Sequence, residues 1–547
     1  MEQIRSDFWA FFLEETSQDV RQVFLQGPLP FRQAAPSVFD KIRRDLAIRL
    51  EAILLPMVVA FVQADRAQST DSASAYLNLF NSKHSETLSR LKEFHSPTVS
   101  LLYQYLRVFR LHVGTLCVRL FSDWDAICSA FDLTEVSTLV AADLMAGDPH
   151  NQGEQTAIFR FDSGGKGLVY KPVDVGVDEL LRSLLTQIRT GFHGHSPTRP
   201  RTLQRHQSGQ SYGYVEYISY QGRVASHEQA RSLFRQFGEL LAFGKGLSIS
   251  DGHYDNLLIH DDEVIWLDLE TAFNFFDDPR VHPIEKTGLL LIARPETTAL
   301  GIATGLQGGV LPRVSLTYPT VHADGTDQMF IRYFALRDVK SHNQVYLGDQ
   351  ACALEDFVED IKFGYATMAE AMRRYASQIE HVIQAAMHHG QVRVRHILQA
   401  TASYARSCAL LRHYAGNRRG NTLLRISNER QKTLSAQEQP FAKFIVENEL
   451  MDLTNGQIPY FYRSSSSRAL YHISGAFRPD FFQLSLLDEV LKHLRETCEA
   501  SIEDDLRFID EAIVSTAGIR GWDQFAERFH FPVFDFQEKL QSMGMAG

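Results

Sequence analysis

The sequence predicts an α+β fold in which a two-lobed mixed core lies between large α-helical additions at both ends. Three observations lead to this fold class. Residues 1–146 carry hydrophobic residues at steps of three and four with few strand signals, short strand patterns alternate with helical ones over residues 147–345, and helical patterns return over residues 346–547. We therefore expect a helical N-terminal domain, a mixed core and a helical C-terminal region with these boundaries.

The composition is that of a soluble globular protein and argues against several classes of function. The chain has 547 residues, 44% hydrophobic and 22% charged, enough for two to four domains or subdomains. A net charge of −11 argues against nucleic-acid binding and against a membrane surface held by charge. The longest apolar run, Ile53–Val62, is too short to span a bilayer, and the charged first residues show no secretion signal. The five cysteines are scattered without a Cys-x-x-Cys pair, so we expect neither a zinc site nor disulfides, and a cytoplasmic location.

The mixed core is expected to open with a hairpin that ends on a lysine. Strands are predicted over Thr156–Phe161 and Gly167–Lys171, joined by a turn that contains Gly164 and Gly165. Backbone N–H groups of such a turn can cover phosphates, although an ordinary β-turn has the same sequence. Kinase-like enzymes keep the lysine that grips ATP phosphates at the end of such a strand, and the alternative for Lys171 is a strand-end lysine in solvent.

A second hairpin follows after a helix at Asp178–Arg189, a strand at Tyr212–Tyr220 and a helix at Ser226–Lys245. This order of elements is that of a two-lobed, kinase-like core. The polar stretch from Gly191 to Gly209 is predicted to be a loop, and a long mixed region is expected beyond Phe273.

The second hairpin carries oxygen-bearing side chains at both ends, Asp251 and Asn256 before it and Asp268 and Glu270 after it. Asp268 comes twelve positions after Asn256, which suits two short strands and a tight turn that return the chain to its start. Four such groups at one point favour a hard cation such as Mg²⁺. Kinases place an Asp near the nucleophile and an Asn and a second Asp on metal in this way. The alternative is an acidic surface hairpin.

In the C-terminal region, Val392–Arg395 alternates like a strand, and Thr401 stands where a helix N-cap is expected. Arg395 and Thr401 are six residues apart, so they can meet one phosphate only if the chain around Arg395 is not a helix. We expect both to face the same cleft as Asp251, with Arg395 placed to bind a phosphate and not a neighbouring carboxylate. Residues 418–425, with three arginines, are predicted to be a polar connection.

Taken together, these motifs resemble the dehydratase domain of class II lanthipeptide synthetases, the LanM family, from about residue 141 to residue 512. The matching segments, in chain order, are Gly147-Asp148-x-His150-Asn151-x-Gly153, Leu168-Val169-Tyr170-Lys171-Pro172, Ser250-Asp251-x-His253-Tyr254-x-Asn256, Leu267-Asp268-Leu269-Glu270-Thr271, Arg395 with Thr401 and Tyr404, and Gly456-x-Ile458-Pro459-Tyr460-Phe461. The sequence departs from the family at Val173, where Arg is usual, and at Gln457, where Asp is usual. The family's cyclase domain has no counterpart in the few dozen residues after Ala512, which contain no cysteine.

The resemblance implies a lipid-kinase-like core and a two-step reaction. Such enzymes use ATP and Mg²⁺ to phosphorylate Ser and Thr of a ribosomal precursor peptide with a leader, and then eliminate the phosphate to leave dehydroalanine or dehydrobutyrine. A separate cyclase would be needed for ring closure. By resemblance, Lys171 holds ATP phosphates, Asn256 and Asp268 hold Mg²⁺, Glu270 is on the metal or behind it, and Asp251 orients or deprotonates the peptide hydroxyl.

The remaining candidates have two interpretations each. His253 either helps the transferred phosphoryl group or braces its loop. Asp148 and His150 are the acid–base pair by resemblance, or simply turn residues. Arg395 is expected to hold the departing phosphate, and Thr401 to add a hydrogen bond, to cap its helix, or both.

Three functions follow: a stand-alone Ser/Thr dehydratase, a kinase of the same fold that stops at phosphorylation of a protein, lipid or small molecule, and a catalytically silent scaffold. The joint presence of Lys171, Asp251, Asn256 and Asp268 argues against the scaffold. Arg395 with Thr401 favours the dehydratase over the kinase.

Overall fold

The computed structural model describes residues 2–68, 75–80, 83–162, 165–193, 200–207, 209–275, 281–294, 304–306, 313–323, 326–336, 342–389, 392–413 and 419–517. Its helices are α1 (Glu2–Leu25), α2 (Leu29–Arg32), α3 (Pro36–Gln68), α4 (Ala75–Phe80), α5 (His84–Ser122), α6 (Trp124–Phe131), α7 (Gly176–His193), α8 (His227–Gly246), α9 (Pro283–Lys286), α10 (Val358–Arg374), α11 (Ala376–His389), α12 (Thr401–His413), α13 (Arg419–Thr433), α14 (Ala442–Thr454), α15 (Leu486–Glu499) and α16 (Ile502–Thr516). The strands are β1 (Leu139–Asp143), β2 (Ala157–Phe161), β3 (Gly167–Lys171), β4 (Thr202–Gln207), β5 (Gln210–Glu216), β6 (Arg223–Val224), β7 (Leu257–His260), β8 (Glu263–Trp266), β9 (Arg313–His322), β10 (Phe330–Leu336), β11 (Tyr346–Leu347), β12 (Gln350–Ala351), β13 (Arg393–His396), β14 (Phe461–Ser464), β15 (Leu470–His472) and β16 (Phe477–Arg478). The predicted α+β class is confirmed.

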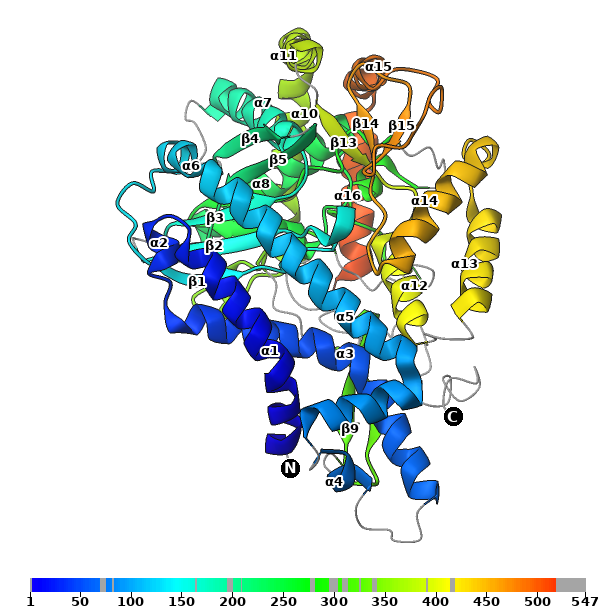
Figure 1. Ribbon diagram of the computed structural model, residues 1–547. Coiled ribbons are helices and arrows are strands. Elements are labelled where there is room, and N and C mark those ends of the chain that lie inside the picture. Colours follow the sequence, from blue (N-terminus) through cyan, green and yellow to red (C-terminus); the bar gives the residue numbers. More distant parts are fainter. Residues whose placement is uncertain are drawn as a thin grey trace.

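The first lobe is an antiparallel sheet packed against the N-terminal helices (Figure 1). Its strand order is β1-β2-β3-β5-β4. Phe31 of α2 packs edge-on against Phe159 of β2 and Trp124 of α6, and one hydrophobic cluster runs from α1 through α5 into the sheet. Because β1 precedes residue 147 and pairs with β2, the sheet begins inside the stretch expected to be helical.

The second lobe is mainly helical and is built around α8 and α10. A second hydrophobic cluster joins α7, α8, the β7–β8 hairpin, α10, α11, α15 and α16. Two glycines let α8 and α10 touch backbone to backbone: a Cβ on Gly238 would lie 1.9 Å from Ile361 O, and one on Gly364 would lie 1.9 Å from Arg235 O. Helices from the last third of the chain therefore complete this lobe.

A third part contains the sheet β13-β14-β15-β16 and helices α12, α13 and α14, which lie beside each other at one side of the molecule in Figure 1. It has its own small hydrophobic clusters, one around Phe444, Phe461 and Phe481 and another around Tyr404 and Leu453. Its first strand, β13, packs against α7 of the second lobe.

Several predicted elements are confirmed at or near their expected bounds: both hairpins, the helix pair α10–α11, strand β13 and the start of α12 at Thr401. Helix α8 begins after Ser226, whose side chain accepts a hydrogen bond from Gln229 N. Two expectations are wrong. The loop predicted over Gly191–Gly209 contains β4, whose polar residues form one edge of the sheet. Residues 419–425 of the predicted polar connection lie in α13, and residue 418 is outside the described residues.

The stretch beyond residue 273 forms a β-hairpin that reaches back to the N-terminal helices. Strands β9 and β10 pair antiparallel, and Asp327 between them accepts hydrogen bonds from Ala75 N and Tyr76 N at the start of α4. In the described ranges, the structure contains no helix whose length and apolar character would suit a membrane crossing.

Candidate active site

Lys171 ends β3 and lies in an ion-pair cluster where the first two lobes meet. Its ammonium Nζ is 3.0 Å from Asp268 Oδ1 and 3.7 Å from Asp178 Oδ1. Burial alone lowers the pKa of Lys171, but the charges of Asp178, Asp268 and Glu270 more than offset this, and the pKa is raised. The lysine is therefore a cation at neutral pH in direct contact with Asp268, and its hold on ATP phosphates stays a prediction.

Asp178 is a member of this cluster that the sequence patterns do not single out. It lies in the first turn of α7, is fully buried, and accepts a hydrogen bond from Arg182 Nη2 at 3.3 Å. Arg182 also donates to Leu267 O at 2.8 Å, directly before Asp268. The pair thus ties α7 both to Lys171 and to the end of the second hairpin. The sequence signal for Asp178 is an acidic residue followed four positions later by an arginine, in the helix that comes after Lys171.

The β7–β8 hairpin brings the residues on its two sides together, as the spacing predicts. Leu267 N donates to Asn256 O at 2.8 Å, so Asp268 follows beside Asn256. Asn256 Nδ2 donates to Asp251 O at 2.8 Å and lies 3.4 Å from His253 Nε2. Asp251 has left-handed backbone with φ 65°, a strained conformation for a residue with a side chain, of the kind that concentrates at functional sites.

The contacts of His253 are those of a residue that braces the loop. Its Nδ1 accepts a hydrogen bond from Asp255 N at 3.2 Å, and its Nε2 is 3.7 Å from Asp251 Oδ1. These contacts hold the imidazole between Asp251 and Asn256 and are compatible with bracing, and direct help to a phosphoryl group stays a prediction.

Asn256 and Asp268 fit a magnesium ion by the chemistry of their oxygens. Asn256 uses its amide nitrogen toward Asp251, which leaves the amide oxygen for a cation, and the 35%-exposed Asp268 binds Lys171 through Oδ1, which leaves Oδ2. Mg²⁺ commonly takes one or two protein oxygens and completes its shell with water and phosphate. In the described part of the chain, no three His, Cys, Asp or Glu side chains are grouped to hold a metal alone, so such an ion would depend on ATP phosphates.

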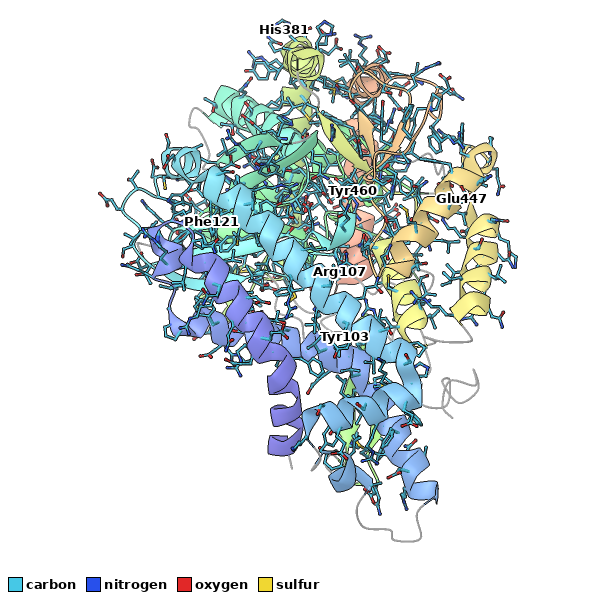
Figure 2. The ribbon with its side chains drawn as sticks, viewed as in Figure 1. Tyr103, Arg107, Phe121, His381, Glu447 and Tyr460 are labelled. Atoms are coloured by element: carbon cyan, nitrogen blue, oxygen red, sulfur yellow. The ribbon has the colours of Figure 1, made fainter. Side chains whose placement is uncertain are left out.

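Glu270 does not fit the metal role expected for it, because both its oxygens are bound by other side chains. Arg395 Nη1 donates to Glu270 Oε1 at 2.8 Å, and Tyr460 OH donates to Oε2 at 3.3 Å. The Arg395 guanidinium also stacks over the Tyr460 ring at 5.2 Å, and Tyr460 lies near the centre of the molecule (Figure 2). The expectation that Arg395 has no neighbouring carboxylate is wrong: β13 carries it directly to Glu270, whose backbone oxygen also accepts from Arg395 N at 2.7 Å.

The β1–β2 loop carries Asp148 and His150 and lies at the Lys171 end of the sheet, because Ala157 at the start of β2 pairs with Tyr170. His150 Nδ1 donates to Ile458 O at 2.7 Å, and burial, helped by the Arg395 charge, lowers its pKa to about 3. Burial raises the pKa of Asp148 above its ordinary 3.8, whereas the positive charge of Arg395 lowers it.

The same strand register corrects the expected role of the glycine turn. The turn joins the end of β2 to the start of β3, whereas Lys171 ends β3, roughly 13 Å away along the strand. Gly165 adopts φ 75° as a turn residue, and the neighbouring Lys166 Nζ donates to Asp132 O, so Gly165 does not lie where it could cover phosphates at Lys171. Gly164 lies outside the described residues. The loop beside Lys171 is the one that carries Asp148.

Thr401 is confirmed at the start of α12, beyond the end of β13, so Arg395 and Thr401 do not share a helix. Within the described ranges its side chain forms no hydrogen bond to the Arg395 cluster, and its role stays a prediction. Gln457, the departure noted above, accepts a hydrogen bond from Gln152 N at 3.1 Å and so joins the two loops that flank His150.

A comparison with protein families matches residues 99–464, more than half of the chain, to a domain of unknown function, DUF4135. The chain belongs to the DUF4135 family. The matched range contains every residue of the cluster, from Asp148 to Tyr460.

This DUF4135 chain is also similar to a curated bacteriocin biosynthesis protein. It is 23% identical over 254 residues to the lacticin 481/lactococcin biosynthesis protein LcnDR2 of Lactococcus lactis subsp. lactis, over 43% of this chain. The match spans 27% of that protein's length. Together with the family match, it confirms the resemblance to the LanM type that the motifs indicated.

Proposed function

We propose that the protein is a lanthipeptide-type Ser/Thr dehydratase with a kinase-like, lipid-kinase-like core, acting on a ribosomally made precursor peptide with a leader. The observation that carries this proposal is a shared site. Arg395, the candidate for elimination, lies in electrostatic range of Asp251 and Asp268, the candidates for phosphorylation, and of Asp148. One bound peptide residue can therefore meet both sets of groups without leaving.

In the phosphorylation step, the Ser or Thr oxygen forms a bond to the γ-phosphorus of ATP while the bond between that phosphorus and the β–γ bridging oxygen breaks, leaving ADP. Lys171 would hold the phosphates, and Asn256 and Asp268 would hold Mg²⁺, which supplies charge neutralisation when bound. Asp251 takes the hydroxyl proton. Asp178 keeps the Lys171 ammonium in place, as an acid on the helix after this lysine does in protein kinases.

In the elimination step, Asp148 takes the Cα proton, the electrons of the Cα–H bond form the Cα=Cβ double bond, and phosphate leaves with the electrons of the Cβ–O bond. Arg395 stabilises the charge on the leaving phosphate because a guanidinium binds phosphate through two N–H groups. Asp148 is the stronger base of the two candidates, since its pKa is raised above 3.8 whereas burial lowers that of His150 to about 3. His150 then orients the loop through its hydrogen bond to Ile458 O.

The test is mass spectrometry of the peptide encoded beside the gene after incubation with the protein, ATP and Mg²⁺. We expect loss of one water per modified Ser or Thr in the wild type. Arg395→Ala should accumulate peptide carrying the mass of a phosphate, and Asp268→Asn should leave it unmodified. A wild-type protein whose final product is phosphopeptide would decide for the second candidate, a kinase of this fold, which the Lys171 cluster by itself supports equally well.

A further inference from the structure

A second arginine, Arg393, lies two positions before Arg395 on the same face of β13. Side chains of alternate strand residues point to the same side, and their Cα atoms are roughly 6.6 Å apart. The structure repeats one arrangement at both positions: the Arg395 guanidinium lies 5.2 Å from the Tyr460 ring centre, and the Arg393 guanidinium lies 5.2 Å from that of Tyr462. Stacking on a ring leaves the N–H edges of a guanidinium able to donate.

The two arginines differ in what occupies their N–H groups. Arg395 is held by Glu270, with the two side chains only 13% and 12% exposed. Arg393, which is half-buried, forms neither an ion pair nor a side-chain hydrogen bond within the part of the chain that the structure describes. It is therefore the cation on this face whose donors are available to a ligand.

The charge of Arg393 acts on the pKa of Asp174, but the carboxylate oxygens of Asp174 are hydrogen-bonded to other residues. Burial raises the pKa of Asp174, and its hydrogen bonds and the Arg393 charge act in the opposite direction. Both carboxylate oxygens of Asp174 accept hydrogen bonds, Oδ1 from Gly176 N at 2.9 Å and Oδ2 from Gln204 Nε2 at 3.3 Å. Asp174 follows Lys171 by three residues, so Arg393 faces the segment that joins β3 to α7.

We propose that Arg393 is a second phosphate-binding residue, which together with Arg395 grips the phosphate that leaves the peptide. This inference rests on the proposed function. Two guanidinium groups on alternate positions of one strand can contact a single phosphate, and each offers paired N–H donors that match its oxygens. Arg395 must exchange Glu270 for phosphate, whereas Arg393 has no ion-paired carboxylate to release among the residues that the structure describes, so Arg393 provides the contact that needs no rearrangement.

The first measurement is the affinity of the full chain for inorganic phosphate, read as the rise in melting temperature across a phosphate titration. Arg393→Gln should weaken phosphate binding about tenfold, the effect of losing hydrogen bonds to a charged group. Arg478→Gln is the matched control, because Arg478 lies on β16 of the same sheet and its guanidinium is also over an aromatic ring, 5.5 Å from the centre of Phe444 in α14. It should bind phosphate like the wild type.

The second measurement follows the peptide product under Mg²⁺ and ATP. Arg393→Gln should phosphorylate at the wild-type rate and accumulate phosphopeptide, and Arg393→Lys, which keeps the charge but not the paired donors, should lie between wild type and Arg393→Gln. The lysine variant also serves if Arg393→Gln fails to fold.

Unchanged phosphate affinity in Arg393→Gln, or a wild type that binds no phosphate, overturns the inference. A fall in ATP affinity in place of phosphate affinity overturns it as well and assigns Arg393 to the nucleotide. If the wild type stops at phosphopeptide, the elimination half of the proposed function fails, and the phosphate titration alone then decides whether Arg393 binds phosphate.

Discussion

Replacing Asp178 by Asn removes one charge from the buried cluster while keeping its shape. Asp178 is fully buried, with Oδ1 3.7 Å from Lys171 Nζ and 3.3 Å from Arg182 Nη2. At an effective dielectric constant of about 20, each contact corresponds to about 5 kcal/mol of attraction, most of which is offset by the cost of removing the charges from water. Removing one partner of a buried pair typically costs 3–5 kcal/mol.

We expect a cost near the lower end of that range, about 3 kcal/mol, because both cations keep another acceptor. Lys171 retains Asp268, and Arg182 retains Leu267 O. The assay is urea unfolding followed by tryptophan fluorescence, with the free energy of unfolding compared between wild type and variant. Glu179→Gln, an exposed neighbour on the same turn of α7, is the matched control and should stay within about 0.5 kcal/mol.

A change below about 1 kcal/mol in Asp178→Asn would show that the two cations do not depend on this carboxylate, and the account of the cluster would be wrong. A second readout separates stability from positioning: the rise in melting temperature with Mg²⁺ and ATP should be smaller in Asp178→Asn than in wild type, because Lys171 loses the contact that orients it. A full nucleotide response in the variant would refute the positioning role.

Three further predictions follow. Asp268→Asn should abolish the stabilisation by Mg²⁺ and ATP and leave the fold intact, and a retained response would contradict the metal assignment. His112 is buried, with Nε2 donating to Leu144 O and Nδ1 accepting from Gln155 N, and burial lowers its pKa to about 4 from 6.5. Between these two pKa values the folded protein binds fewer protons than the unfolded chain. His112 should therefore contribute about 3 kcal/mol of stability at neutral pH, which is lost as the pH falls from 6.5 to about 4. His112→Gln should flatten this part of the plot of stability against pH. Gly238→Ala should destabilise by about 3 kcal/mol or more, because its methyl group would meet Ile361 O, whereas Gly114→Ala, with open space around the added group, should not.

The two hairpins were predictable because local rules determine them, whereas the place of Lys171 beside the second hairpin was expected only from the kinase-like order of elements. A strand alternates, a tight turn reverses it, and the spacing of twelve positions from Asn256 to Asp268 suits two short strands joined by such a turn. The position of Gly165 could not be obtained in this way. Which end of a hairpin faces a site depends on the partner strands, and only the pairing of Ala157 with Tyr170 shows that the loop with Asp148 lies beside Lys171.

Long-range pairing also explains the contacts of Glu270 and the error in α13. Glu270 follows the expected metal residue Asp268, yet Arg395, distant in sequence, takes its carboxylate. The sequence of α13 has few hydrophobic residues because part of its buried surface is provided by Arg430, which donates to Glu449 at 3.0 Å. Hydropathy patterns do not register a buried arginine that is paired with an acid.

The two glycines between α8 and α10 restrict how this molecule can move. Helices that touch through side chains can slide past each other by small steps, but a backbone-to-backbone crossing has a single permitted register, since a shift of one residue brings a Cβ into a carbonyl oxygen. The second lobe therefore behaves as a rigid base for the loop that carries Asp251 and Asn256. We therefore expect any change in the distance between Lys171 and Asp268 during a catalytic cycle to come from rotation of the β1-β2-β3-β5-β4 sheet against that base, which includes α7.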